Sequence, residues 1–292
     1  MRRLAAKFAM LPTMVIVAVV YVGCILWTVR ISFTSSRSLP TYDFVGLDQY
    51  VSLFRSSRWM ISLENMFLFG AAYIVGCLIV GYLMAIFIDQ RVRAENTLRT
   101  IYLYPHALSF IVTGLVWQWM LNPTLGLQHL VREWGWESFS FDWIVNRDMA
   151  IYTLVIAGIW HGAGFVMALL LAGLRSVDAE IWKVSRIDGI PAWRMYVQVI
   201  LPILAPMVAT CAFLLSAQAV KAYDIVVAMT KGGPGIATEV PAKYVMDYLF
   251  ERQSIGRATA GAVVMLVMVI SIAAPVLYAR WYRKDQASGG AR

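Results

Sequence analysis

The stretch VDAEIWKVSRIDGIPAWRMYVQVILP, residues 177–202, is a long polar interruption in the hydrophobic second half of the chain. Asp178 and Glu180 fall in the first turn of a predicted helix, where carboxylates complement the positive end of the helix dipole. Gly189 and Pro191 end that helix, because Gly favours the left-handed cap conformation and the Pro ring cannot continue an established helix. The stretch therefore predicts a loop made of helix, break and helix between two hydrophobic segments.

The first helix of this loop carries an apolar stripe. Ile181, Val184 and Ile187 recur at every third position, beside Lys183 and Arg186. Such a helix requires a partner surface, and its spacing and composition leave two partners open. It could lie on lipid headgroups as a basic interfacial helix, or it could dock against another protein.

The composition of the whole chain indicates a membrane protein. Sixty per cent of its 292 residues are apolar and 14% are charged, and its mean hydropathy is +0.66. A typical soluble domain has about 45–50% apolar and about 25% charged residues. The protein is therefore predicted to cross a lipid bilayer several times.

Six apolar segments are long enough to cross a hydrocarbon core of about 30 Å. Pro105 lies near the start of the third segment, where a first-turn Pro removes only an unpaired donor. His161 lies in an H-G-A-G motif that predicts a break in the middle of the fourth. The predicted fold is all-α, with transmembrane helices at residues 8–29, 66–88, 101–121, 149–174, 203–227 and 258–279.

Charge predicts the orientation of these helices. The leader, the 89–100 loop, the 174–202 loop and the tail together hold 14 Lys and Arg against 6 Asp and Glu, whereas the rest of the chain holds 11 of each kind. The net charge of +8 thus lies on one side, which the positive-inside rule assigns to the cytoplasm. Both termini are therefore predicted to be cytoplasmic, and the basic pI reports topology rather than nucleic-acid binding.

Three separated motifs resemble those of permease subunits of bacterial ABC importers, in particular the maltose-type sugar permease family. The first is F-V-G-L-D-Q-Y at residues 44–50, and the second is the E-A-A loop motif with a downstream I-L-P. The third combines Lys221, Tyr223 and Asp224 with T-K-G-G-P-G at residues 230–235. In the loop, the residues that match the family pattern are Glu180, Arg186, Ile187, Asp188, Gly189, Leu201 and Pro202.

The resemblance implies that the 177–202 loop is a coupling helix that docks into a separate ATPase subunit. The sequence departs from the family where Lys183, Val184 and Ser185 occupy the E-A-A triplet itself, so we expect a compensating change in the partner ATPase. The residues expected to couple to the ATPase are Glu180, Lys183, Val184, Ser185, Arg186, Asp188 and Gly189.

The resemblance also implies an assembly and an organisation of the chain. It implies a type I ABC importer fold in the bacterial cytoplasmic (inner) membrane, with a second homologous permease, two ATPase copies and an external solute-binding protein. This chain would bind no cofactor, because ATP and Mg²⁺ would be held by the partner ATPase. The chain divides into a leader with the first span and outer loop, a permease core and a basic cytoplasmic tail, at residues 1–62, 63–280 and 281–292.

The polar residues within the spans are candidates for a solute path, because intramembrane polar groups usually face a cavity or another helix. Gln218, Lys221, Tyr223 and Asp224 form the richest group. Lys221 and Asp224 are three residues apart, so a continuous helix would place them on one face, able to pair. The group could line the path for a sugar or sugar derivative, with Lys221 favouring an anionic one. It could equally be a structural ion pair at the helix end.

Other polar and aromatic residues leave similar alternatives. Trp117 and Gln118 could line the path or sit in an interfacial aromatic belt. His161 has no second ligand at metal spacing on its own span, which favours a helix-packing role over a metal site, although it remains a candidate for the path. Arg175 is expected to be a cytoplasmic anchor.

The sequence lacks the motifs that common enzymatic functions require. It contains no H-E-x-x-H, G-x-S-x-G or P-loop motif, so ATP hydrolysis would require another polypeptide. Two alternatives to a permease remain at this stage. An ion-coupled secondary transporter would often show inverted repeats and broken helices, and a non-conducting scaffold subunit would need no solute path.

Overall fold

The computed structural model describes the backbone of residues 2–90 and 92–289, and the side chains of residues 10–90, 92–185 and 187–275. Within these residues every regular element is a helix, and extended pairing is confined to an isolated bridge between Thr34 and Phe44. The prediction of an all-α chain is therefore confirmed. The chain divides into two compact units, Met1–Met60 with Pro241–Met268 and Ile61–Val240 with Val269–Arg292.

In the first unit, aromatic side chains from the start of one long helix and from two short helices pack together. Trp59 packs edge-on against Tyr244, with ring centroids 5.1 Å apart, and Tyr244 stacks on Tyr248 at 4.3 Å. Burial raises the pKa of the Tyr244 phenol to about 12. The helices of this unit are α1 (Arg2–Val17), η1 (Ala18–Val22), α2 (Gly23–Ile31), α3 (Asp48–Phe54), the start of α4 (Ser57–Asp89), α14 (Pro241–Met246), η4 (Asp247–Glu251) and the first part of α15 (Ile255–Gly289).

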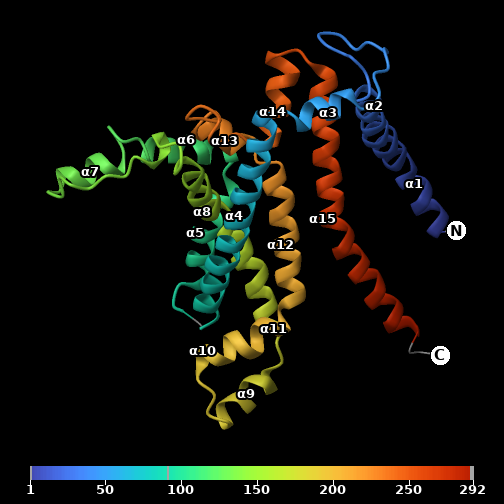
Figure 1. Cartoon of the computed structure of the whole chain (residues 1–292). Coiled ribbons are helices and arrows are strands. Elements are labelled where there is room, and N and C mark those ends of the chain that lie inside the picture. Colours follow the sequence, from blue (N-terminus) through green and yellow to red (C-terminus); the bar gives the residue numbers. More distant parts are fainter. Residues whose placement is uncertain (1, 91, 290–292) are drawn as a thin grey trace. The chain divides into compact units, whose positions relative to one another are not determined.

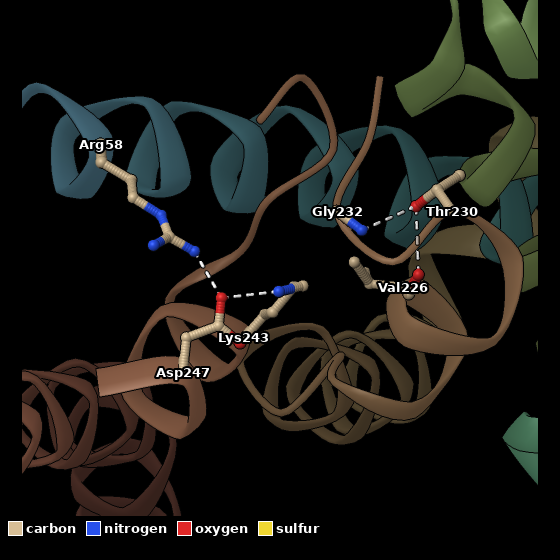
Figure 2. A network of polar contacts seen from close by, with 6 residues as sticks. All are labelled: Arg58, Val226, Thr230, Gly232, Lys243 and Asp247. Atoms are coloured by element: carbon tan, nitrogen blue, oxygen red, sulfur yellow. Dashed lines mark hydrogen bonds and ion pairs between the residues drawn. The ribbon is translucent and has the colours of Figure 1, made fainter. Parts of the chain in front are cut away.

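A buried carboxylate joins two helices of this unit. Asp247 accepts a 2.7 Å hydrogen bond from Lys243, one turn earlier, and forms an ion pair with Arg58 at the start of α4 (Figure 2). Two cations facing one carboxylate compensate its removal from water. This contact fixes α14 and η4 against the first turn of α4.

The second unit is built around α8 (Ala150–Arg175), which carries much of the buried surface. Figure 1 shows α9 and α10 at the end of this unit opposite to α6 and α13. Its remaining helices are the rest of α4, α5 (Glu95–Ala107), α6 (Phe110–Met120), α7 (Leu127–Glu133), η2 (Trp143–Val145), α9 (Ala179–Ile187), α10 (Ala192–Arg194), η3 (Met195–Ile200), α11 (Leu201–Ile203), α12 (Ala205–Val220), α13 (Asp224–Met229) and the last part of α15.

In the part of the chain that the structure describes, fewer unbroken helices could cross a membrane than the six that the sequence predicts. Four qualify by length and composition: Met10–Ile31, Ser57–Asp89, Ala150–Arg175 and Ile255–Pro275. Two bent pairs also qualify, Glu95–Ala107 with Phe110–Met120 at 97° and Ala192–Ile203 with Ala205–Val220 at 72°, so the described residues hold four spans, or up to six if each pair is one span. The chain is a multi-pass membrane protein.

The predicted continuous third span is wrong. The helix begins at Glu95 and ends at Ala107, so Pro105 lies in its last turn instead of its first. Leu108 is extended, with φ −77° and ψ 150°, and Ser109 starts the next helix by accepting a hydrogen bond from the Val112 amide. The chain turns here because Leu108 leaves the helical conformation and the Ser109 side chain caps a new helix.

The predicted continuous fifth span is also wrong. It bends at Leu204, just before Pro206, whose missing amide removes a helix hydrogen bond at this point. It ends at Val220, and a turn leads to α13, which begins at Asp224.

The predicted break at His161 is wrong, since α8 runs without interruption through its H-G-A-G motif. The glycines serve close packing instead. A Cβ atom added at Gly164 would lie 1.8 Å from the Tyr102 carbonyl oxygen, so only glycine lets α5 approach α8 this closely.

Candidate functional site

A cavity of about 400 Å³ lies within the second unit, where α4, α6, α8, α12 and α13 meet. Its size falls in the range of about 300–1,000 Å³ that is typical of small-molecule sites. Most of its lining is apolar, with a few polar side chains. The residues that line it are Phe69, Tyr73, Phe110, Phe165, Leu214, Ala217, Gln218, Lys221, Ala222, Asp224 and Ile225.

Aromatic rings make one wall of this cavity. Phe69 and Tyr73, one turn apart on α4, are stacked with centroids 5.4 Å apart and planes 5° apart. Phe110 stacks on His161 at 4.0 Å, and Phe165 stacks on a second histidine, His106, at 4.9 Å. The four rings that line the cavity therefore come from three helices, and flat apolar faces of this kind suit a ligand that is apolar on one face and polar at its edges.

Gln218, Lys221 and Asp224 are the other polar side chains that line the cavity besides Tyr73. The Tyr73 hydroxyl donates a 2.8 Å hydrogen bond to Oε1 of Gln218 on α12. This bond uses one of the two lone pairs of the amide oxygen, so the side-chain NH₂ and the second lone pair remain to meet a ligand. Gln218 is thereby held in a fixed orientation at the cavity wall.

Lys221 and Asp224 both line the cavity and both are exposed, but the predicted pairing between them is wrong. Among the residues that the structure describes, no ion pair joins these two side chains. The reason is the turn after α12: the Tyr223 amide donates to the Lys221 carbonyl at 2.7 Å, and a new helix begins at Asp224. The one-face spacing of a continuous helix therefore does not apply. Tyr223 lies outside the lining of the cavity, at the cap of α13.

The structure places the other predicted path residues away from this cavity. His161 is buried behind Phe110, and its Nε2 lies 3.1 Å from the Leu108 carbonyl oxygen, which can only accept a hydrogen bond. Trp117 packs edge-on against Trp160, with centroids 6.0 Å apart. Gln118 lines a separate hollow of about 280 Å³ beside Thr230.

The T-K-G-G-P-G motif forms a turn after α13. The Thr230 hydroxyl donates to the Val226 carbonyl at 3.0 Å and accepts from the Gly232 amide at 3.3 Å (Figure 2). Lys231 and Gly232 have positive φ, of 53° and 89°. The motif thus closes α13 through one side chain.

The 177–202 loop has the predicted local structure. Helix α9 spans Ala179–Ile187, the Asp178 carboxylate accepts a 3.0 Å hydrogen bond from the Glu180 amide, and Gly189 has φ +65°. Two members of the predicted stripe face solvent, since Val184 is 56% and Ile187 is 84% exposed.

The remaining predicted coupling residues divide by exposure. Lys183 and Asp188 are exposed, as are Glu180 and Gly189, whereas Ser185 is buried. The side chain of Arg186 lies outside the described residues. The loop therefore presents an apolar edge flanked by charges, which is suited to docking.

Several contributors to the site were not predicted. The Phe69 and Tyr73 pair carries a sequence signal, because aromatic residues four apart lie on one helix face. Phe110 and Phe165 carry no such sequence signal, since they come together only through tertiary packing. Arg175 was expected to be a simple anchor, but it forms a 2.7 Å ion pair with Glu95 and lies 4.0 Å from Asp89.

Known proteins resemble this chain along most of its length. Residues 78–284 match the family described as "Binding-protein-dependent transport system inner membrane component". A probable ABC transporter permease protein of Pyrococcus horikoshii is 34% identical, with 95% of each chain covered. A xylose/arabinose import permease protein of Haloferax volcanii is 28% identical over 90% of this chain and 84% of its own.

A solved structure shares the fold. It is the crystal structure of a bacterial alginate ABC transporter in complex with an alginate pentasaccharide-bound periplasmic protein. One of its chains superposes with a TM-score of 0.80 at 18% identity, covering 95% of this chain and 93% of that one.

Proposed function

Because the chain belongs to the family of inner-membrane components of binding-protein-dependent transport systems, we propose that it is the permease subunit of an ATP-driven importer for a sugar or sugar derivative. The chain itself is a transport subunit and not an enzyme. It lies in the bacterial cytoplasmic (inner) membrane, crosses it six times and keeps both termini in the cytoplasm.

The cavity is the observation that carries this proposal. A solute with a flat apolar face and polar edges, as a sugar ring has, matches a cavity lined by stacked aromatic rings and by the Gln218 amide beside them. Few polar contacts leave the solute able to depart again, which transport requires. Lys221 and Asp224 lie at the same cavity and would contact the hydroxyl groups of the solute.

The proposed transporter contains three further components. A second homologous permease completes the path, a pair of ATPase subunits binds ATP and Mg²⁺, and an external solute-binding protein delivers the solute. Helix α9 is the element that docks into the ATPase, since its exposed Val184 and Ile187 offer an apolar edge. In this docked position Lys183 would contact an acidic residue of the ATPase. In relatives that have the E-A-A triplet, the acidic residue at this position would contact a basic one.

Purification of the tagged chain from native membranes in mild detergent tests the assembly. A P-loop ATPase and a second permease should accompany it, and Asp188→Arg or Gly189→Asp should release the ATPase. Gly189 has φ +65°, so any side chain there strains the end of α9. Recovery of the chain alone, without ATPase activity, would contradict the proposal.

Solute class is tested in proteoliposomes that hold the purified complex. Uptake of one member of a panel of radiolabelled mono- and disaccharides should require ATP and the solute-binding protein. Uptake driven by an ion gradient without ATP would favour a secondary transporter, and a complex that assembles but moves nothing would favour a scaffold.

A further inference from the structure

Helix α9 is joined to the transmembrane helix α4 by a short chain of contacts. Trp182 of α9 packs edge-on against the ring of Tyr196, with centroids 5.5 Å apart. The backbone carbonyl of Tyr196 accepts a 2.7 Å hydrogen bond from the Tyr82 hydroxyl of α4. Three residues therefore connect the exposed loop helix to α4, a 33-residue helix whose greater part lies in the second unit.

The position of Tyr196 makes this contact specific. Tyr196 lies in the π-helical turn η3 (Met195–Ile200), and its carbonyl also accepts the amide of Leu201. A carbonyl oxygen has two lone pairs, so it can hold both donors at once. Single π-helical turns occur frequently at functional sites. Here the turn presents a carbonyl to a side chain of another helix.

Helix α4 leads from this contact to the cavity. Tyr73 lies nine residues before Tyr82 on the same unbroken helix, which is about 14 Å along its axis at about 1.5 Å per residue. Tyr73 and Phe69 line the cavity, and Tyr73 holds Gln218. A displacement of α9 that moves the cytoplasmic part of α4 would therefore also move one wall of the cavity.

We propose that Trp182, Tyr196 and Tyr82 form a coupling strut that transmits movement of α9 to the solute cavity through α4. Tyr82 is the positioning residue of this strut: it touches neither the solute nor the ATPase, and it acts by holding α4 to the Tyr196 carbonyl. The inference rests on the proposed function, because it takes α9 as the ATPase-docking element.

The sequence provides a matched pair of hydroxyl deletions to test the strut. Tyr82→Phe removes the hydroxyl that bonds the Tyr196 carbonyl, whereas Tyr196→Phe removes a hydroxyl and keeps both that carbonyl and the ring on Trp182. Trp182→Leu, which removes the ring contact, should behave like Tyr82→Phe. Copurification of the ATPase and thermal stability of each complex show that the variants assemble.

The movement is followed at the cavity itself. Leu214 lines the cavity and is exposed, so a Leu214→Cys substitution in a Cys24→Ser background reports access through maleimide labelling. ATP with vanadate should change the labelling rate of the parent complex. In Tyr82→Phe the change should be about five-fold smaller, the factor that corresponds to about 1 kcal/mol for one neutral hydrogen bond, whereas Tyr196→Phe should respond as the parent does.

The result separates the strut from the solute assignment. Sugar uptake by the wild-type complex, measured in the same preparation, tests the proposed function, while labelling tests the strut without any solute. An unchanged response in Tyr82→Phe, an equal loss in Tyr82→Phe and Tyr196→Phe, or a parent complex whose labelling ignores ATP would each overturn the strut.

Discussion

Arg175, the last residue of α8, forms a 2.7 Å ion pair with Glu95, the first residue of α5. The same guanidinium lies 4.0 Å from Asp89 at the end of α4. One cation therefore joins the ends of three helices immediately before α9, which begins at Ala179.

Replacement of Arg175 by Gln should weaken this junction. All three groups are partly exposed, so water and salt screen the interaction, and we expect a loss of about 1 kcal/mol or less in stability. Thermal unfolding of the purified complex in detergent measures the change. The difference from wild type should shrink in about 1 M salt, where the Debye length is about 3 Å. A deficit that salt leaves unchanged would mean that Arg175 acts through packing instead of charge.

Gln218 should control solute affinity because Tyr73 holds its amide at the cavity wall. Gln218→Ala should raise the KM for uptake roughly ten-fold, the effect of losing about 1.4 kcal/mol of hydrogen bonding. Gln118→Ala is the matched control, because Gln118 lines a different hollow. An equal effect of both substitutions on KM would refute the assignment of the cavity.

Tyr73 and Gln218 should also behave as a coupled pair. Tyr73→Phe removes the hydroxyl that orients Gln218, so part of the loss caused by Gln218→Ala should already be present in Tyr73→Phe. A double-mutant cycle on KM should give a coupling free energy of about 1 kcal/mol. Strict additivity of the two changes would show that the hydrogen bond plays no part in solute binding.

Ile187 should be required for ATPase docking but not for folding. Its side chain is 84% exposed, so Ile187→Asp removes apolar surface that nothing in the second unit covers among the described residues. The ATPase should be lost from the purified complex while the permease pair stays intact. Leu125→Asp, which changes an apolar residue that is 78% exposed outside the loop, should retain the ATPase.

The positive charge of Lys183 should contribute to binding of the partner ATPase. It is exposed on α9, where Lys183→Glu restores an acidic side chain of the kind that the E-A-A motif carries. If the partner offers an acid there, Lys183→Glu should weaken ATPase recovery several-fold more than Lys183→Gln, because like charges repel. Equal recovery for both variants would show that no acidic partner faces this residue.

Folding of the protein should depend on the negative charge of Asp247. It is buried between Arg58 and Lys243 (Figure 2), and removal of one partner from a buried ion pair costs about 3–5 kcal/mol. Asp247→Asn leaves two cations without their carboxylate and should reduce the yield of folded protein in fluorescence-detected size-exclusion chromatography. Asp48→Asn, a change near the start of α3, is the control. Normal yield for Asp247→Asn would show that the network adds little.

The sequence was sufficient to predict those features of the protein that depend on composition and on neighbouring residues. The apolar composition determined the membrane class, and Asp178, Gly189 and Pro191 determined the start and end of α9, because caps and breakers act within a turn. The motif at 230–235 likewise determined a turn, through the Thr230 hydroxyl and residues with positive φ.

The tertiary structure decided what depends on distant segments. The sequence did not reveal that the chain bends near Pro105 and Pro206, where the two helix pairs bend by 97° and 72°. Lys221 and Asp224 have helical spacing in the sequence, yet a turn after Val220 separates them.

The wall of the cavity also depends on segments that are distant in the sequence. Phe69 shares it with Phe110 and Phe165, which come from other helices, and no local pattern brings these rings together. Side-chain packing between helices is specific to shape, whereas helix formation follows from periodicity and caps. Residue pattern was therefore sufficient for the class of the protein and for the local structure of residues 177–202, whereas packing between helices decided where the cavity lies.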